Sequence, residues 1–169
     1  MVGWLLLAAT LIPCHSPNWH VRTTEARIRA LVDEGRARSE TFRHLLATLD
    51  ASDVIVYVEP KLTRPALGGF LFNRIVARDH WRYIRIAVEQ EGSHARLIAL
   101  LAHELQHAVE VAQQVEVRDA LSLERMFSRV SVAHGCAGAS CYETQAAQDI
   151  EWRVLREFKT AHPVLEVYQ

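Results

Sequence analysis

The sequence predicts a single α+β domain, and three observations carry this prediction. Apolar residues recur at helical spacing in the N-terminal third, β-rich runs occupy the middle, and helical spacing returns towards the C-terminus. A length of 169 residues suits one hydrophobic core. We therefore expect one domain over residues 21–169, preceded by an apolar segment over residues 1–20.

The first expected element is an amphipathic helix between Arg22 and Leu49. Gly35 is the candidate position for a break in it. Its apolar residues recur three and four positions apart: Ile28, Leu31, Val32, Phe42, Leu45, Leu46 and Leu49. The following run, "SDVIVYVEP", predicts a buried strand that ends at Pro60.

Two further β-rich runs, "LGGFLFNRIVAR" and "YIRIAVEQ", flank the short segment "DHWR" and predict a hairpin. Ser93 is a suitable N-cap for a helix that continues to about Val117. A shorter helix over 119–130 and a glycine-containing loop should follow. The last expected helix runs from about Tyr142 to Thr160.

The charge pattern gives no sign of a nucleic-acid partner. The net charge is −1, and basic and acidic residues are interspersed. The run from Val2 to Ile12 is too short to span a bilayer but suits the apolar part of a secretory signal. It lacks the basic start and cleavage site of such a signal, so a partly buried N-terminal segment is an equal alternative. Export or membrane association would depend on this segment alone, and a cytoplasmic location would follow without it.

Two cysteines, Cys136 and Cys141, flank the short loop "CAGASC". In an oxidising compartment a disulfide between them is plausible. In a reducing cytosol both would be ordinary small residues.

The segment "LLAHELQHAVEVA" contains the motif H-E-x-x-H as His103, Glu104 and His107. Residues four apart lie on one face of a helix, so both histidines can bind one zinc ion. Glu104 points about 100° away, where it can accept a proton from water activated by the metal. The alternative is a solvated helix face that carries these residues by chance.

A third ligand is needed, and the extension H-E-x-x-H-x-x-G-x-x-H does not supply it. Its glycine position is Glu110 and its histidine position is Gln113. Glu110 lies about 10.5 Å along the helix from His103, which is too far for both to share one ion with His107. We expect Glu110 to be a neighbouring carboxylate that orients a histidine ring.

The other candidate ligand is Glu143, at the start of the apolar stripe of the last helix: Ala147, Ile150, Val154 and Phe158. A carboxylate on a core-facing stripe is costly to bury unless something pairs with it, and zinc would be such a partner. The alternative is a carboxylate stabilised by the helix macrodipole. Asp149 and Glu151 are expected to face solvent.

With "HELQH" on one helix and a glutamate on a later one, the chain resembles the gluzincin type of zincin metallopeptidase. "HELQHAVE" followed by "YET" and "AA" also resembles small bacterial proteins predicted to be metallopeptidases. The resemblance implies a compact zincin-like fold with His103, His107 and Glu143 as zinc ligands and Glu104 as general base. It also implies a peptide or protein substrate. An aspartate that often follows the ligand glutamate by four residues is replaced by Ala147.

Such enzymes stabilise the oxyanion with a tyrosine or histidine. His134 is the first candidate here, and Tyr142 and Tyr168 are the others. They also bind the substrate along a strand edge, for which the strand over residues 83–90 is the candidate.

The sequence therefore predicts a zinc-dependent hydrolase, most specifically a peptidase. The main alternative is a non-catalytic protein in which zinc is structural. A di-iron carboxylate protein is weaker, because its second E-x-x-H would have to come from another helix. The only further instance, Glu91 to His94, lies at the start of the same helix.

Overall fold

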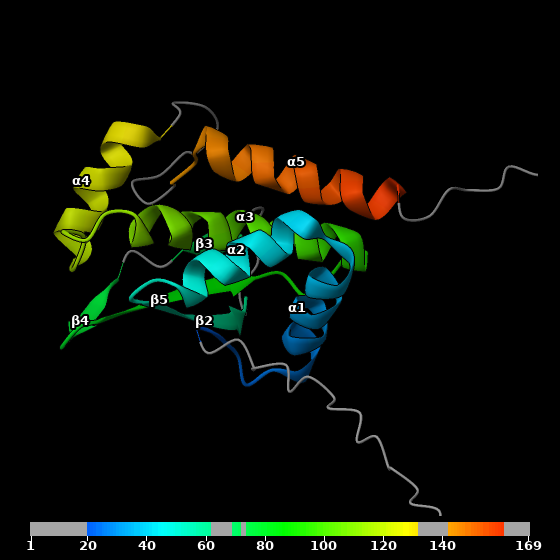
Figure 1. Cartoon of the computed structure of the whole chain (residues 1–169), viewed down its shortest axis with the longest axis horizontal. Helices are drawn as coiled ribbons and strands as arrows, with labels where there is room; N and C mark the ends of the chain where they lie inside the picture. Colours follow the sequence, from blue (N-terminus) through cyan, green and yellow to red (C-terminus); the bar gives the residue numbers. More distant parts are fainter. Residues whose placement is uncertain (1–19, 62–68, 72–73, 132–141, 161–169) are drawn as a thin grey trace, which may run out of the picture.

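The structure, a computed structural model, describes residues 20–61, 69–71, 74–131 and 142–160. Within them, helices pack against a mixed sheet, which confirms the α+β class (Figure 1). Several predictions concern residues outside the described ranges: the N-terminal segment over 1–19, His134, the Cys136–Cys141 pair and Tyr168.

The sheet has the strand order β1 (Val21–Arg22), β2 (Val54–Pro60), β5 (Trp81–Val88) and β3 (Gly69–Leu71). β4 (Val76–Arg78) also pairs with β5, on the same side of β5 as β3, and both pairings are antiparallel. β1, β2 and β5 run parallel to one another. The predicted strand at β2 and the hairpin between β4 and β5 are confirmed.

β5 is a central strand, so the expectation that residues 83–90 form a free edge is wrong. The strand bonds to β2 on one side and to β3 and β4 on the other. Among the described strands, β1 forms one edge of the sheet and β3 with β4 forms the other, and a further strand could join the β3–β4 edge.

The predicted N-terminal helix is two helices, α1 (Ala26–Arg38) and α2 (Glu40–Asp50), and its break is at Ser39. The Ser39 hydroxyl caps α2 by accepting a hydrogen bond from the Phe42 amide at 2.9 Å. Gly35 lies inside α1 instead, where an added Cβ would stand 2.9 Å from the Phe42 ring and 3.0 Å from Ile98. Its role is to let the helices approach closely.

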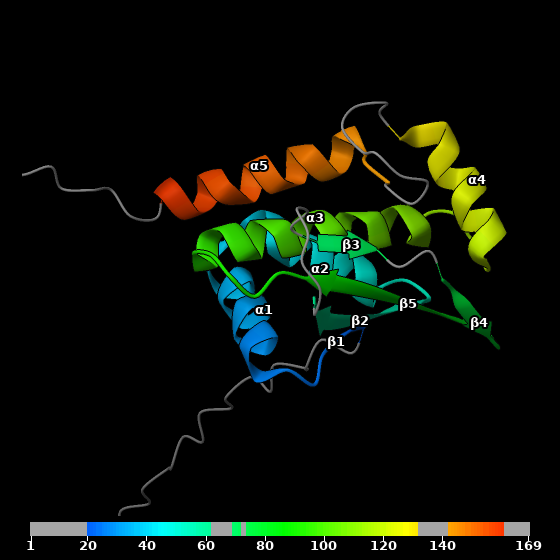
Figure 2. The same cartoon turned by 180° about the vertical axis from the view of Figure 1, so that it is seen from behind.

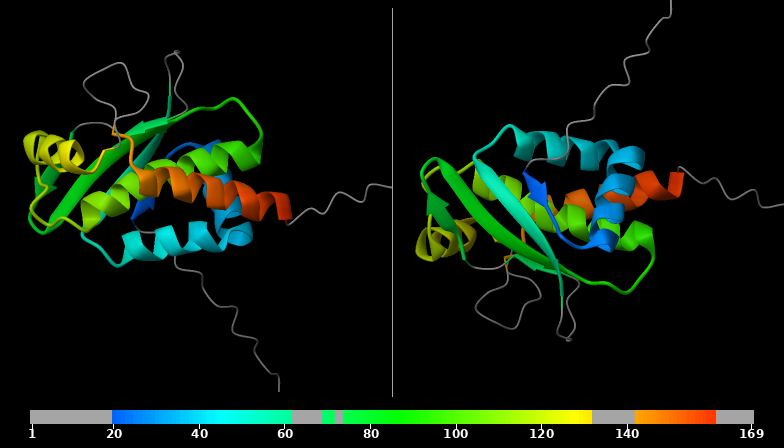
Figure 3. Two further views of the ribbon diagram at one scale, coloured as in Figure 1. Left: turned by 90° about the horizontal axis from the view of Figure 1, so that it is seen from above. Right: turned by 90° about the horizontal axis from the view of Figure 1, so that it is seen from below.

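The central element is α3 (His94–Ala112), which lies between the sheet and α5 (Gln145–Thr160) (Figures 1 and 2). In the right-hand view of Figure 3, from below, β2 and β5 lie in front of α3 and α5. Most residues of α3 from Leu97 to Val111 are buried, so the helix is enclosed on nearly all sides. No described helix is both long and apolar enough to cross a membrane.

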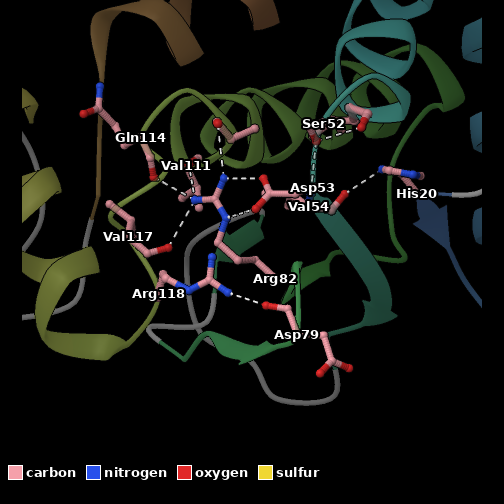
Figure 4. A network of polar contacts seen from close by, with 12 residues as sticks. His20, Ser52, Asp53, Val54, Asp79, Arg82, Val111, Gln114, Val117 and Arg118 are labelled. Carbon is pink, nitrogen blue, oxygen red and sulfur yellow. Dashed lines mark hydrogen bonds and ion pairs between the residues drawn. The ribbon is translucent and has the colours of Figure 1, made fainter.

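Ser93 caps α3 as predicted, but the helix ends at Ala112 rather than near Val117. The fully buried Arg82 of β5 causes this end (Figure 4). Its guanidinium donates to the backbone carbonyls of Val111, Ala112, Gln114 and Val117 and to both oxygens of Asp53. An arginine from a distant strand therefore satisfies the carbonyl groups that a helix leaves unpaired at its C-terminus.

The two remaining predicted helices are present with small shifts. α4 (Ala120–Val130) begins with Asp119 in a capping box with Ser122. α5 begins three residues later than expected, because Thr144 accepts a hydrogen bond from the amide of Ala147 at 3.2 Å and acts as the cap.

Candidate metal centre

The three motif residues lie in the core. His103 is 8% exposed, Glu104 3% and His107 2%. A solvated helix face is therefore not their environment. Burying a carboxylate between two imidazoles is costly unless the groups are hydrogen-bonded or bind an ion, so their partners decide what the cluster does.

Glu143 stands opposite the motif, one residue before the cap of α5. Its Oε1 atom lies 3.5 Å from Nε2 of His103. The two helices that carry these residues, α3 and α5, pack along each other (Figures 1 and 2). The structure thus places the predicted third ligand beside the first histidine.

Each histidine uses its Nδ1 atom to bind a carboxylate. Nδ1 of His103 lies 3.1 Å from Oε2 of Glu151, and Nδ1 of His107 lies 3.0 Å from Oε2 of Glu110. Ionised carboxylates only accept hydrogen bonds, so each ring carries its proton on Nδ1. In the neutral ring Nε2 is then left with a lone pair, which is the arrangement of zinc-bound histidines in proteins. The contact expected for Glu110 is present.

Glu151 is half-buried and bonds His103 rather than facing solvent freely, so the expectation for it is wrong, whereas Asp149 is exposed as expected. Glu151 lies one helical turn after the buried Ala147 and three residues before the buried Val154, within about 60° of both around the axis. It therefore borders the buried face of α5, and this spacing was the signal in the sequence that could have identified it.

Two buried carboxylate oxygens in this cluster lack a hydrogen-bond partner among the described residues. They are Oε2 of Glu104 and Oε1 of Glu143. Buried polar atoms without partners are rare in proteins and call for an explanation, such as an ion or a water. Both lie in the group that contains His103 and His107.

The electrostatics of the cluster are those of acidic groups around two imidazoles. Burial raises the pKa of Glu104, and the neighbouring charges of His107 and His103 offset part of this rise. Burial alone would lower the pKa of His103, but the hydrogen bond to Glu151 and the charge of Glu104 raise it above its ordinary value. The same hydrogen bond from His103 lowers the pKa of Glu151.

The spacing of the donor atoms suits a zinc ion. Two ligands at about 2.0–2.1 Å from a tetrahedral zinc stand about 3.3 Å apart, close to the 3.5 Å between His103 Nε2 and Glu143 Oε1. The rings of His103 and His107 have centroids 5.0 Å apart. Two imidazoles on one zinc ion would have centroids about 5 Å apart. However, no three such side chains among the described residues already form a metal-binding group, so these are converging donors rather than a finished ligand shell.

Aromatic rings close one side of the cluster. The His107 ring meets Phe127 of α4 edge-on at 5.4 Å between centroids, and Phe127 stacks on Tyr142 at 4.2 Å. Tyr142, one of the oxyanion candidates, is thus separated from His107 by a ring, and its pKa is raised by burial and by Glu124.

Comparison of the chain with protein-family models, with curated proteins and with solved structures gives no match. The case for a function therefore depends on the arrangement of these side chains.

Proposed function

We propose that the chain is a zinc-dependent hydrolase, with His103, His107 and Glu143 as the metal ligands. The observation that carries this proposal is the pairing of donor atoms. Both histidines have Nδ1 engaged by a carboxylate, and a buried Glu143 oxygen without a hydrogen-bond partner stands 3.5 Å from Nε2 of His103. A purely structural cluster would satisfy these atoms within the chain.

In this proposal Glu104 is the general base. Its Oε2 atom is buried and unpaired, so it can accept a proton from a water molecule and return it to the leaving group. A zinc ion in this place would supply the acidification of that water and the polarisation of the scissile carbonyl. Glu151 and Glu110 keep the imidazoles in the tautomer with Nε2 free.

The proposed substrate is a peptide in extended conformation. The resemblance of the H-E-x-x-H motif and the later glutamate to gluzincins supports this choice. The β3–β4 side of the sheet could receive an extended chain, because β3 ends the described strand order and contacts α3. This edge replaces the β5 edge expected from the sequence.

The test is hydrolysis of denatured casein by the zinc-loaded protein, followed by mass spectrometry of the fragments. We expect internal cleavage by the wild type and a loss of about 10²-fold or more in Glu104→Gln, which should keep its zinc. Equal cleavage by Glu104→Gln would show that Glu104 is not the base. Zinc binding without any cleavage would favour the alternative of a structural zinc site.

A further inference from the structure

A hydrogen-bonded chain joins the start of α5 to the second histidine of α3. The Thr144 hydroxyl donates to Oε1 of Glu110 at 2.6 Å, and Oε2 of Glu110 accepts from Nδ1 of His107 at 3.0 Å. Thr144 directly follows Glu143. We propose that Thr144 and Glu110 are positioning residues that hold Glu143 in register with His107; this inference rests on the proposed zinc site.

The Thr144 hydroxyl is held in place by two hydrogen bonds, one as donor and one as acceptor. It donates its hydrogen to Glu110 and accepts the amide hydrogen of Ala147, which caps α5. Thr144 is 3% exposed. Adjacent Cα atoms are about 3.8 Å apart, so anchoring Thr144 leaves Glu143 little freedom to move away from α3.

Glu110 is fixed in the same way, because each of its oxygens has a partner. Oε1 accepts a hydrogen bond from Thr144 at the start of α5, and Oε2 accepts one from Nδ1 of His107 and so orients its ring. A displacement of α5 would therefore disturb two ligands at once: Glu143 through the backbone and His107 through Glu110. Partners of this kind outside the ligand set contribute about 10–100-fold to metal affinity.

A second threonine–glutamate hydrogen bond to α5 offers a matched control. Thr41 of α2 donates its hydroxyl hydrogen to Oε1 of Glu157 in α5, also at 2.6 Å. This pair ties α5 to α2 and is not bonded to either histidine. Replacing Thr41 removes a threonine–glutamate bond of equal length without touching the proposed site.

The experiment measures zinc affinity of the full chain by competition with a chromophoric chelator, with zinc alone as the probe. We expect the Kd to rise about 10-fold in Thr144→Val and in Glu110→Gln. The double variant should lose little more than either single variant, because both act through one chain of bonds. Thr144→Ser keeps the hydroxyl and should restore the wild-type Kd, and Thr41→Val should leave it unchanged.

Thermal unfolding of the metal-free variants separates a loss of zinc affinity from a loss of folding stability. This control is needed because Thr144→Val also removes the cap of α5, whereas Glu110→Gln does not. Wild-type affinity in Glu110→Gln, or an equal loss in Thr41→Val, would overturn the inference while the zinc site stands. If the wild type binds no zinc, the proposed function and this inference fail together.

Discussion

Helix α3 carries two buried polar clusters that are satisfied in opposite ways. At its C-terminal end, Arg82 is fully buried, and its hydrogen bonds go to four carbonyl groups and to both oxygens of Asp53. In its middle, the cluster around His103 and His107 includes two buried carboxylate oxygens with no hydrogen-bond partner.

We infer from this difference that the first cluster is structural and that the second is the candidate functional site. A buried charge that is fully paired within the chain needs nothing further and holds elements in place. A buried cluster with unpaired oxygens and imidazole lone pairs is incomplete until something else is bound. The predictions below test each side of this comparison.

The largest expected effect is on folding, from Arg82→Met. Removing the guanidinium leaves Asp53 and several carbonyls unpaired, so the free energy of unfolding should fall by about 3–5 kcal/mol. Urea unfolding measures this loss. The control is Arg85→Met on the same strand, where the side chain is 55% exposed and pairs with Glu59. Its loss of stability should be much smaller, and similar losses in both variants would remove the distinction.

The next effect comes from adding metal. Zinc at about 100 times its Kd should raise the free energy of unfolding by about 2.7 kcal/mol in the wild type. His107→Ala should show no such rise, because it lacks a ligand. Arg82→Met should show the full zinc-dependent rise in the free energy of unfolding, because this substitution changes the Arg82 cluster and leaves the zinc ligands in place. Thermal melts with and without zinc give the comparison, and an equal rise in His107→Ala would place the metal elsewhere.

A smaller effect is expected from Glu151→Gln. The variant loses the carboxylate that bonds Nδ1 of His103, and the zinc Kd should rise about 10-fold. Asp149→Asn is the control, because Asp149 is exposed on the same helix and bonds only Gln145 in the described contacts. Competition titrations that give the same Kd for both variants would rule out an orienting role for Glu151.

The smallest effect is the acid dependence of the Arg82 cluster. The hydrogen bond from Arg82 lowers the pKa of Asp53 below the ordinary aspartate value of 3.8. A carboxylate with a lowered folded-state pKa contributes stability above its unfolded-state pKa and loses it as the pH falls through the folded-state pKa. Asp53→Asn should therefore cost about 1 kcal/mol at pH 7. The gap to the wild type should close below pH 3.8 in melts measured from pH 5 to pH 2.5, and a constant gap would contradict this.

The elements that local signals define could be predicted from the sequence. Ser93 marks the start of α3, and the β-rich runs on either side of "DHWR" indicate the hairpin of β4 and β5. The end of α3 could not be predicted, because it depends on a side chain of β5, Arg82, that is distant in the sequence. The break at Ser39 was missed for a related reason: Gly35 is required by packing against Phe42, not by a turn.

The site shows the same division. The histidine pair and Glu104 could be identified because one helix fixes their spacing. Glu143 could be suggested from its place on the α5 stripe, but its distance to His103 depends on how two helices pack. Thr144 went unnoticed, because its role comes from a contact with Glu110 across that packing.

The most direct test of the zinc site is metal content after loading with zinc and removing the free ion. The proteins are the wild type, His107→Ala and Glu143→Ala, with circular dichroism to verify folding. We predict about one zinc per wild-type chain, none in His107→Ala, and binding at least about 10-fold weaker in Glu143→Ala. A wild type that retains no zinc, or a His107→Ala variant that retains all of it, would contradict the zinc site between α3 and α5.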